Sequence, residues 1–262
     1  MPETIIKKSK PMIYGGFNSS PVSIIIPFHG CYEKVSRLVK SILFATRSNP
    51  YEICLVDDAS KNKNFINEMS NVPQVNAIRS DKHVGFGGAL KIGFERTQQP
   101  WVVFLHSDCK VEDINWLMQM GKSLLNLKKN NVRMISARSN NPGEGFKRLK
   151  SAKTDKNPDI ILQNVRDGFL PLYCTMCHRE LFANIGGFIK NYYPIGYEDE
   201  ELAYRMNYHG FKQAICGRSW VYHEGGATKK QLCIKDKNFA RIIEGNREKC
   251  ENDIKNLYGK HK

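Results

Sequence analysis

The stretch Val22-Ser-Ile-Ile-Ile26 is the clearest sign of the fold in this sequence. It is a continuous apolar run, mostly β-branched, between Pro21 and Pro27, and this pattern predicts a strand buried on both faces. Residues 33–46 follow with apolar side chains at helical spacing, and the same alternation of strand and helix continues along the chain. The expected strands cover residues 22–26, 51–56, 75–79, 101–105, 133–137, 170–177, 212–216 and 220–223, and the expected helices cover 33–46, 88–96, 114–127, 179–185, 200–209 and 235–257. This order predicts an α/β protein with a mostly parallel central sheet flanked by helices.

The composition is that of an ordinary folded chain of one or two domains. Its 262 residues are 41% hydrophobic and 25% charged, which excludes a disordered or fibrous chain. No apolar run reaches the ~18 residues that a membrane helix needs, and the N-terminus lacks the apolar core of a secretory signal. Eight scattered cysteines favour reduced thiols. We therefore expect a cytoplasmic protein without a transmembrane segment.

The positive charge is concentrated in two short segments. Of the formal net charge of +14, residues 122–156 carry +8 and residues 228–262 carry +5. Solvated surface lysines and an anionic partner, including nucleic acid, are both consistent with this clustering. Neither zinc-finger spacing nor an RNA-recognition aromatic signature is present. The pair Cys174 and Cys177 lacks the second ligand pair that a structural zinc site would need.

Three acidic groups follow apolar segments. They are Asp57-Asp58, Asp108 and Glu198-Asp-Glu-Glu201, each expected at the end of a strand. Each one alone is consistent with a surface loop. Together they predict a ligand site, because the carboxyl ends of parallel strands meet at one edge of a sheet. Carboxylate oxygens there suit Mg²⁺ or Mn²⁺.

A series of short motifs carries a resemblance to a known family. In chain order they are Ser23-Ile-Ile-Ile-Pro27, Leu55-Val-Asp-Asp-Ala-Ser60, Gly85-Phe-Gly-Gly-Ala89, Phe104-Leu-His-Ser-Asp108, Ile185-Gly-Gly-Phe188 and Tyr197-Glu-Asp-Glu-Glu-Leu-Ala-Tyr-Arg205. The chain resembles a family 2 glycosyltransferase with the nucleotide-diphospho-sugar transferase (GT-A) fold. The resemblance implies a GT-A domain over 21–228, with a Rossmann-like nucleotide-sugar half (about 21–138) and an acceptor half (about 139–228). It leaves an N-terminal extension (1–20) and a basic helical tail (229–262) uncovered.

The same resemblance implies a set of donor-binding residues. Pro27 and Phe28 would line the nucleotide base pocket, and the acceptor-only carboxylates of Asp57 and Asp58 would bind the base or ribose. The Gly85 turn would allow close backbone approach at a helix start, although a plain helix start explains it as well. The remaining donor-contact residues implied by the family pattern are Gly87, Lys91, Ser107 and Gly187.

The resemblance also implies a metal site and a catalytic base. Asp108 would bind the divalent cation, Mn²⁺ or Mg²⁺, at the diphosphate, with the late histidine His223 as a second ligand. His106 stands where the family has an Asp; it suits Mn²⁺ better than Mg²⁺, and a structural role is the alternative. Asp199 would accept the proton of the acceptor hydroxyl in an inverting transfer, with Glu198 as the alternative base or an acceptor-positioning group. Glu201, four residues before Arg205, fits an ion pair within one helix.

Several partners remain open at this level. The donor would be a UDP-, GDP- or dTDP-sugar and the acceptor a glycan or lipid-linked glycan, with the basic tail resting on an anionic surface such as a membrane. One alternative is a non-catalytic basic nucleic-acid-binding module, and another is a glycosyltransferase that acts on nucleic acid. A sugar nucleotidyltransferase is disfavoured because Pro27-Phe-His-Gly-Cys31 lacks the basic residues of its usual glycine-rich loop.

Overall fold

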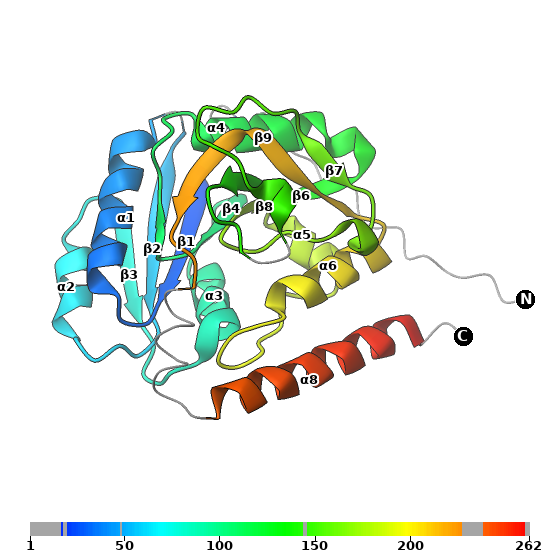
Figure 1. Ribbon diagram of the computed structural model, residues 1–262. Coiled ribbons are helices and arrows are strands. Elements are labelled where there is room, and N and C mark those ends of the chain that lie inside the picture. Colours follow the sequence, from blue (N-terminus) through cyan, green and yellow to red (C-terminus); the bar gives the residue numbers. More distant parts are fainter. Residues whose placement is uncertain (1–16, 18–19, 48, 144–145, 227–237, 260–262) are drawn as a thin grey trace, which may run out of the picture.

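The structure is a computed structural model that describes residues 17, 20–47, 49–143, 146–226 and 238–259. Within these residues one nine-stranded mixed sheet runs in the order β3-β2-β1-β4-β8-β6-β9-β5, and β7 pairs with β9 outside this path (Figure 1). The strands are β1 (Val22–Phe28), β2 (Tyr51–Asp57), β3 (Val75–Arg79), β4 (Trp101–Leu105), β5 (Cys109–Lys110), β6 (Val132–Ser139), β7 (Ile160–Leu162), β8 (Cys174–His178) and β9 (Lys212–His223). The helices are α1 (Tyr32–Ala45), α2 (Asn64–Ser70), α3 (Gly85–Glu95), α4 (Trp116–Asn126), α5 (Glu180–Asn184), α6 (Glu198–Tyr208) and α8 (Phe239–Gly259).

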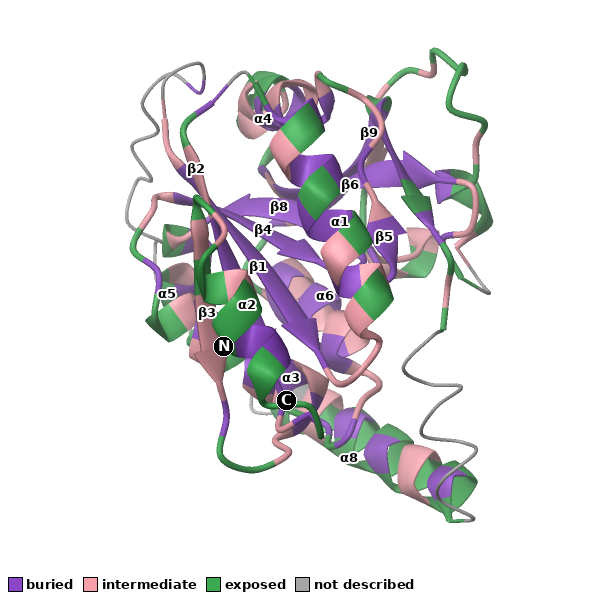
Figure 2. Ribbon diagram, turned by 90° about the vertical axis from the view of Figure 1, so that its left-hand side faces the viewer, coloured by how far each residue is buried: buried purple, intermediate pink, exposed green. Residues whose placement is uncertain are grey.

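The N-terminal half of the sheet is parallel. β1 pairs with β2 and β4, and β2 pairs with β3, all in parallel register. Every residue of β1, β4 and β8 is buried, as Figure 2 shows, which confirms the buried strands expected from their apolar runs. The carboxyl ends of β1, β2 and β4 therefore lie at one edge of the sheet.

The C-terminal half of the sheet contains both parallel and antiparallel strand pairs. β8 lies antiparallel between β4 and β6, and β9 runs parallel to β6. The two strands expected at 212–216 and 220–223 form one continuous strand, because a register shift between Ser136 and Arg138 of β6 accommodates the polar residues between them. The structure also adds α2 and the two-residue strand β5, which pairs antiparallel with the end of β9.

One of the three acidic groups is placed differently from expectation. Asp57 ends β2 and Asp108 follows β4, but residues 198–201 follow a loop and open helix α6. The backbone of Tyr197 lies in the left-handed region, with φ of 72°, and turns the chain directly into the helix. The strand-end assignment was therefore wrong for this group, since the apolar residues before it belong to a loop.

The structure also changes the interpretation of the two positively charged segments. Within 122–156 the guanidinium groups of Arg133, Arg138 and Arg148 donate to backbone carbonyls, so part of this charge has a structural role. Helix α8 itself contains as many acidic as basic residues, and the surplus of the tail falls at 229–237 and 260–262, outside the described residues. Most of the N-terminal extension and residues 235–237 of the last expected helix also lie outside them. Among the described residues, no helix is long and apolar enough to cross a membrane.

The packing of α3 on the sheet yields a stability prediction. A Cβ at Gly93 would lie 2.5 Å from Cγ2 of Ile25, so α3 sits against β1 at a distance that only glycine permits. We expect Gly93→Ala to lower the free energy of unfolding by about 1–3 kcal/mol, because the added methyl overpacks the core. Urea unfolding measures the change. The matched control is Gly245→Ala on exposed α8, where nothing lies within 4 Å and the greater helix propensity of alanine should be neutral or stabilising. Equal destabilisation by both substitutions would contradict this packing.

Candidate functional site

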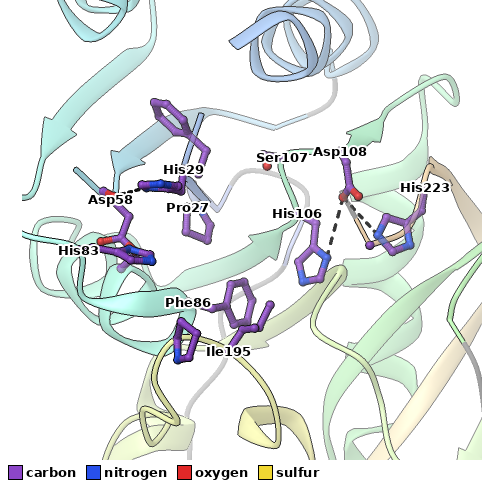
Figure 3. A pocket seen from close by; sticks show the side chains of 14 residues that line it. Pro27, His29, Asp58, His83, Phe86, His106, Ser107, Asp108, Ile195 and His223 are labelled. Atoms are coloured by element: carbon purple, nitrogen blue, oxygen red, sulfur yellow. Dashed lines mark hydrogen bonds and ion pairs between the residues drawn. The ribbon is translucent and has the colours of Figure 1, made fainter. Parts of the chain in front are cut away.

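A cavity opens at the carboxyl edge of the parallel strands. It is lined from β1, the α3 start, the turn after β4, the loop before α6 and the end of β9 (Figure 3). Two polar clusters occupy its opposite ends, one around Asp58 and the other around Asp108, with Pro27 and Phe86 between them. The lining residues are Pro27, Phe28, His29, Asp58, His83, Phe86, Ala89, His106, Ser107, Asp108, Pro194, Ile195, His223 and Gly226. The site thus collects the expected residues Pro27, Phe28, Asp58, Ser107 and all three expected metal ligands.

Asp58 ties the end of β2 to the start of α3. Its carboxylate accepts hydrogen bonds from the backbone N–H of Val84 (2.6 Å) and Gly85 (2.9 Å), and Nδ1 of His83 lies 2.6 Å from it. These contacts use most of its acceptor capacity, so its evident role is to hold the α3 start. The neighbouring Asp57 is buried against Arg79 and does not line the cavity.

Two histidines at this end were missed by the sequence analysis. The rings of His29 and His83 are stacked, with centroids 4.5 Å apart. Nδ1 of His29 lies 2.7 Å from the carbonyl oxygen of Asp58, and Nε2 of His83 is buried without a hydrogen-bond partner among the described residues. Flat rings with one unused polar atom suit a planar heterocycle. In the sequence, only their positions could have identified these histidines as cavity residues. His29 follows Pro27-Phe28, and His83 lies shortly before the Gly85 turn.

At the other end, Asp108 and His223 face each other. Nε2 of His223 lies 3.2 Å from Oδ1 of Asp108, and both residues are buried. Nδ1 of His223 lies 2.7 Å from the carbonyl oxygen of Asn141 and donates to it, so Nε2 is the ring nitrogen that faces the carboxylate. That Nε2 has no hydrogen-bond partner among the described residues. An imidazole nitrogen and a carboxylate oxygen are ligand atoms for divalent metals, and two of them placed this close together fit a shared metal ion.

His106 completes a three-ligand group. Its Nδ1 lies 4.0 Å from Oδ1 of Asp108, and ligand atoms of all three residues fall within 4.8 Å of one another. Burial, with a smaller contribution from His223, lowers the pKa of His106 to about 4, so its imidazole is neutral at pH 7. A neutral imidazole is the form that binds metals. The ring of Phe86 packs edge-on against it, with centroids 5.1 Å apart. Two imidazoles and one carboxylate suit Mn²⁺ better than Mg²⁺.

Glu198 and Asp199 lie in the first turn of α6 and do not line the cavity, although Ile195 just before them does. Burial, with a smaller contribution from the nearby Asp199, raises the pKa of Glu198 to about 8. Burial also raises the pKa of Asp199, to about 6. At pH 7 the Asp199 carboxyl is therefore ionised while that of Glu198 is protonated.

Other expected residues have structural surroundings. Glu201 and Arg205 form the ion pair expected within α6, and Arg205 also donates to the carbonyl oxygen of Gly187, which does not line the cavity. Lys91 faces Glu95 at 3.8 Å on the exposed side of α3, away from the cavity. A Cβ at Gly87 would lie 2.8 Å from the carbonyl oxygen of Lys190, so packing against the loop before α6 already requires this glycine.

Comparison with known proteins agrees with this geometry. Residues 23–186 match the family Glycosyl transferase family 2. The chain belongs to this family. The match covers the parallel half of the sheet, the cavity edge at Asp58 and the turn at Asp108. Family membership confirms the resemblance seen in the sequence and makes this a glycosyltransferase domain.

Similar proteins fall into two groups. The human polypeptide N-acetylgalactosaminyltransferase 16 is 32% identical over 116 residues, which are 44% of this chain and 20% of that protein. The O-antigen biosynthesis protein RfbC of Myxococcus xanthus is 22% identical over 236 residues, which are 83% of this chain and 18% of that protein. The chain thus spans about a fifth of the length of these curated relatives.

A solved structure shares the fold. The crystal structure of GalNAc-T7 with UDP, GalNAc and Mn²⁺ superposes with a TM-score of 0.60 at 19% identity, over 86% of this chain and 48% of that chain. This match confirms the expected GT-A fold.

The buried Glu198 carboxyl predicts a pH-dependent stability. The unfolded chain releases this proton near the ordinary glutamate pKa of 4.5, whereas burial in the folded chain raises the pKa to about 8. The folded state is therefore destabilised as the pH rises between these values. We expect Glu198→Gln to remove this penalty, so that its melting temperature exceeds that of the wild type at pH 8.5 but not at pH 5, by about 2–4 °C for each kcal/mol. Parallel melting curves in differential scanning fluorimetry across this pH range would contradict the assignment.

Proposed function

We propose that this domain transfers a sugar from a UDP-sugar to an acceptor hydroxyl with the help of Mn²⁺. The proposal rests chiefly on the pair formed by Asp108 and His223, in which Nε2 of His223 lies 3.2 Å from the carboxylate and makes no hydrogen bond to any described residue. The GalNAc-T7 structure, which was solved with UDP and Mn²⁺, supports the choice of this nucleotide and this metal among those considered.

The two ends of the cavity divide the work of donor binding. Asp108, His223 and His106 would hold the cation, and a cation bound there would supply positive charge next to the leaving nucleoside diphosphate. His29 and His83 form the wall against which the base stacks, and Pro27 lies between the two clusters. Asp58 acts through the backbone of Val84 and Gly85, whose position it fixes.

Asp199 is the proposed base of an inverting transfer. A general base works best when it is ionised at the operating pH and its pKa lies close to that pH. The pKa of about 6 satisfies this condition for Asp199, whereas Glu198, with a pKa of about 8, keeps its proton at pH 7. Glu198 then serves to support the α6 start, since the backbone N–H of Gly196 donates to it at 2.6 Å.

For the acceptor we propose a hydroxyl on a glycan or lipid-linked glycan. The protein RfbC, which matches 83% of this chain, is named for O-antigen biosynthesis. The nucleic-acid alternative gains no support from the geometry, because Arg133, Arg138 and Arg148 of the basic segment are engaged by the chain's own carbonyls.

A donor-hydrolysis screen tests the function. UDP-, GDP- and dTDP-sugars are each incubated with Mn²⁺ or Mg²⁺, and free nucleoside diphosphate is measured. We expect hydrolysis of a UDP-sugar that depends on Mn²⁺. The absence of both hydrolysis and UDP binding in the presence of Mn²⁺ would contradict the proposal.

The ligand group predicts how metal binding responds to substitution. We expect Asp108→Asn and His223→Gln to weaken Mn²⁺ binding by about 10–100-fold or more, since removal of even an outer partner costs that much. His106→Gln should show a smaller loss, because its nitrogen lies farther from Asp108. Isothermal titration of Mn²⁺ measures this without any turnover. The matched control is His209→Gln, which replaces an exposed histidine. An unchanged Mn²⁺ affinity in Asp108→Asn would exclude the proposed metal site.

The proposed base predicts a pH profile. Because Asp199 must be ionised to accept a proton, kcat should fall as the pH is lowered through the Asp199 pKa of about 6. Asp199→Asn should lower kcat by roughly 10²–10⁴-fold and leave UDP binding nearly unchanged. The control is Glu248→Gln, which removes an exposed carboxylate from α8. Normal turnover in Asp199→Asn, or a product that retains the anomeric configuration by NMR, would exclude this role.

A further inference from the structure

The loop of residues 189–197, here called the bridging loop, forms one wall of the cavity. Pro194 and Ile195 line it directly. The carbonyl oxygen of Pro194 accepts a hydrogen bond from the backbone N–H of Phe86 at 2.9 Å, and the Asn191 side chain donates to the carbonyl oxygen of Val84 at 2.9 Å. The loop therefore connects the α3 start with the first turn of α6.

The loop does not hold its shape by regular hydrogen bonding. It forms neither helix nor strand, and at its end Gly196 and Tyr197 have φ of 115° and 72°. A left-handed conformation is unfavourable for a tyrosine, so surrounding contacts must stabilise it. Its polar backbone groups also need partners from outside the loop.

Asn246 of α8 supplies those partners. Its side chain is buried, and its Nδ2 lies 3.0 Å from the carbonyl oxygens of both Tyr192 and Tyr193 and 3.3 Å from that of Ile195. The two amide hydrogens are shared among three acceptors. Only a donor fits at this point, because three carbonyl oxygens converge on it.

Other contacts from α8 surround this amide. The hydroxyl of Tyr192 donates to Asp253 at 2.8 Å, and Nζ of Lys190 lies 3.2 Å from the same carboxylate. Nζ of Lys249 donates to the carbonyl oxygen of Asn191 at 3.3 Å. Figure 1 shows α8 running beside α6 and the bridging loop, beyond the residues matched by the family.

We infer that α8 is a clamp for the active site and that Asn246 is its positioning residue. By holding the carbonyl oxygens of the bridging loop, Asn246 fixes the cavity wall at Pro194 and Ile195 and the first turn of α6, where Asp199 lies. That Asn246 fixes the bridging loop does not depend on what the domain catalyses. The expected change in kinetics does, and it rests on the proposed function.

The kinetic test replaces the donor with an acceptor of the same shape. In Asn246→Asp a carboxylate faces three carbonyl oxygens, so the loop should move away from the α3 start. We expect KM for the UDP-sugar to rise and kcat/KM to fall by about 10²-fold, the cost of a displaced wall. A merely less stable protein would lower the active fraction and leave KM unchanged. The matched control is Asn252→Asp, the same substitution at an exposed position of α8, which should behave as wild type.

Hydrogen exchange tests the clamp without turnover. In Asn246→Asp the peptide covering the bridging loop should exchange about tenfold faster, while β1 and β4 stay protected. Tyr192→Phe removes only the hydroxyl contact with Asp253 and should accelerate exchange of the same peptide to a smaller extent. If Asn246→Asp fails to fold, this second variant provides the test. Unchanged loop exchange in the folded variants, or unchanged KM with accelerated exchange, would overturn the positioning role. If no donor is turned over at all, exchange and Mn²⁺-dependent UDP binding test the clamp separately from the proposed function.

Discussion

The antiparallel pairing of Cys109 with His223 is the constraint on which the site depends. It joins the turn after β4 to the end of β9, more than a hundred residues later in the chain. The backbone N–H of Glu224 donates to the carbonyl oxygen of Asp108 at 3.1 Å, so the turn is held next to the strand end. Tyr173 stacks on the His223 ring with centroids 4.9 Å apart. The orientation of His223 toward Asp108 follows from these contacts and needs no further adjustment.

The rest of the cavity is built around that pair by three separate parts of the chain. The parallel strands supply the edge where Pro27 and Asp58 lie, because their apolar runs are buried on both faces and must end together. Asp58 then fixes the start of α3, and the bridging loop packs on the glycines of that start so closely that side chains there would collide. Helix α8 holds the loop from outside. The cavity edge, the start of α3 and the start of α6 are therefore coupled through the backbone at Gly85 and Pro194.

The sequence predicted the fold to the extent that burial determines it. Continuous apolar runs such as Val22–Ile26 located the buried strands, and the family motifs located Asp108 and His223. The two-residue strand β5 is too short to leave a sequence pattern, yet its pairing with β9 brings Asp108 and His223 together. The continuity of β9 depends on a register shift in its pairing with β6. The sequence does not reveal this shift, because residues 217–219 interrupt the apolar pattern of the strand.

The site residues that escaped the sequence analysis did so because their roles arise from contacts between distant segments. His83 and His29 have no periodicity, and only the fold stacks them. In the sequence, nothing distinguishes Asn246 from the other polar residues of its charged helix. Its role follows only from the three backbone carbonyl oxygens around it in the fold. Gly87 was expected to contact the donor, and the structure adds a second reason for a glycine there, its close approach to the loop carbonyl of Lys190. Lys91 matched the family pattern in position, but the helix turns it toward Glu95 and solvent.

We propose that Asp108 and His223 hold a cation at one end of a nucleotide-binding cavity. Anomalous diffraction at the manganese edge, from crystals grown with Mn²⁺ and UDP, is the sharpest test of this proposal. We expect one strong anomalous peak between Oδ1 of Asp108 and Nε2 of His223, with the diphosphate beside it and the base toward His29 and His83. Ordered UDP in the cavity without manganese at this pair, or manganese bound at another position, would contradict it.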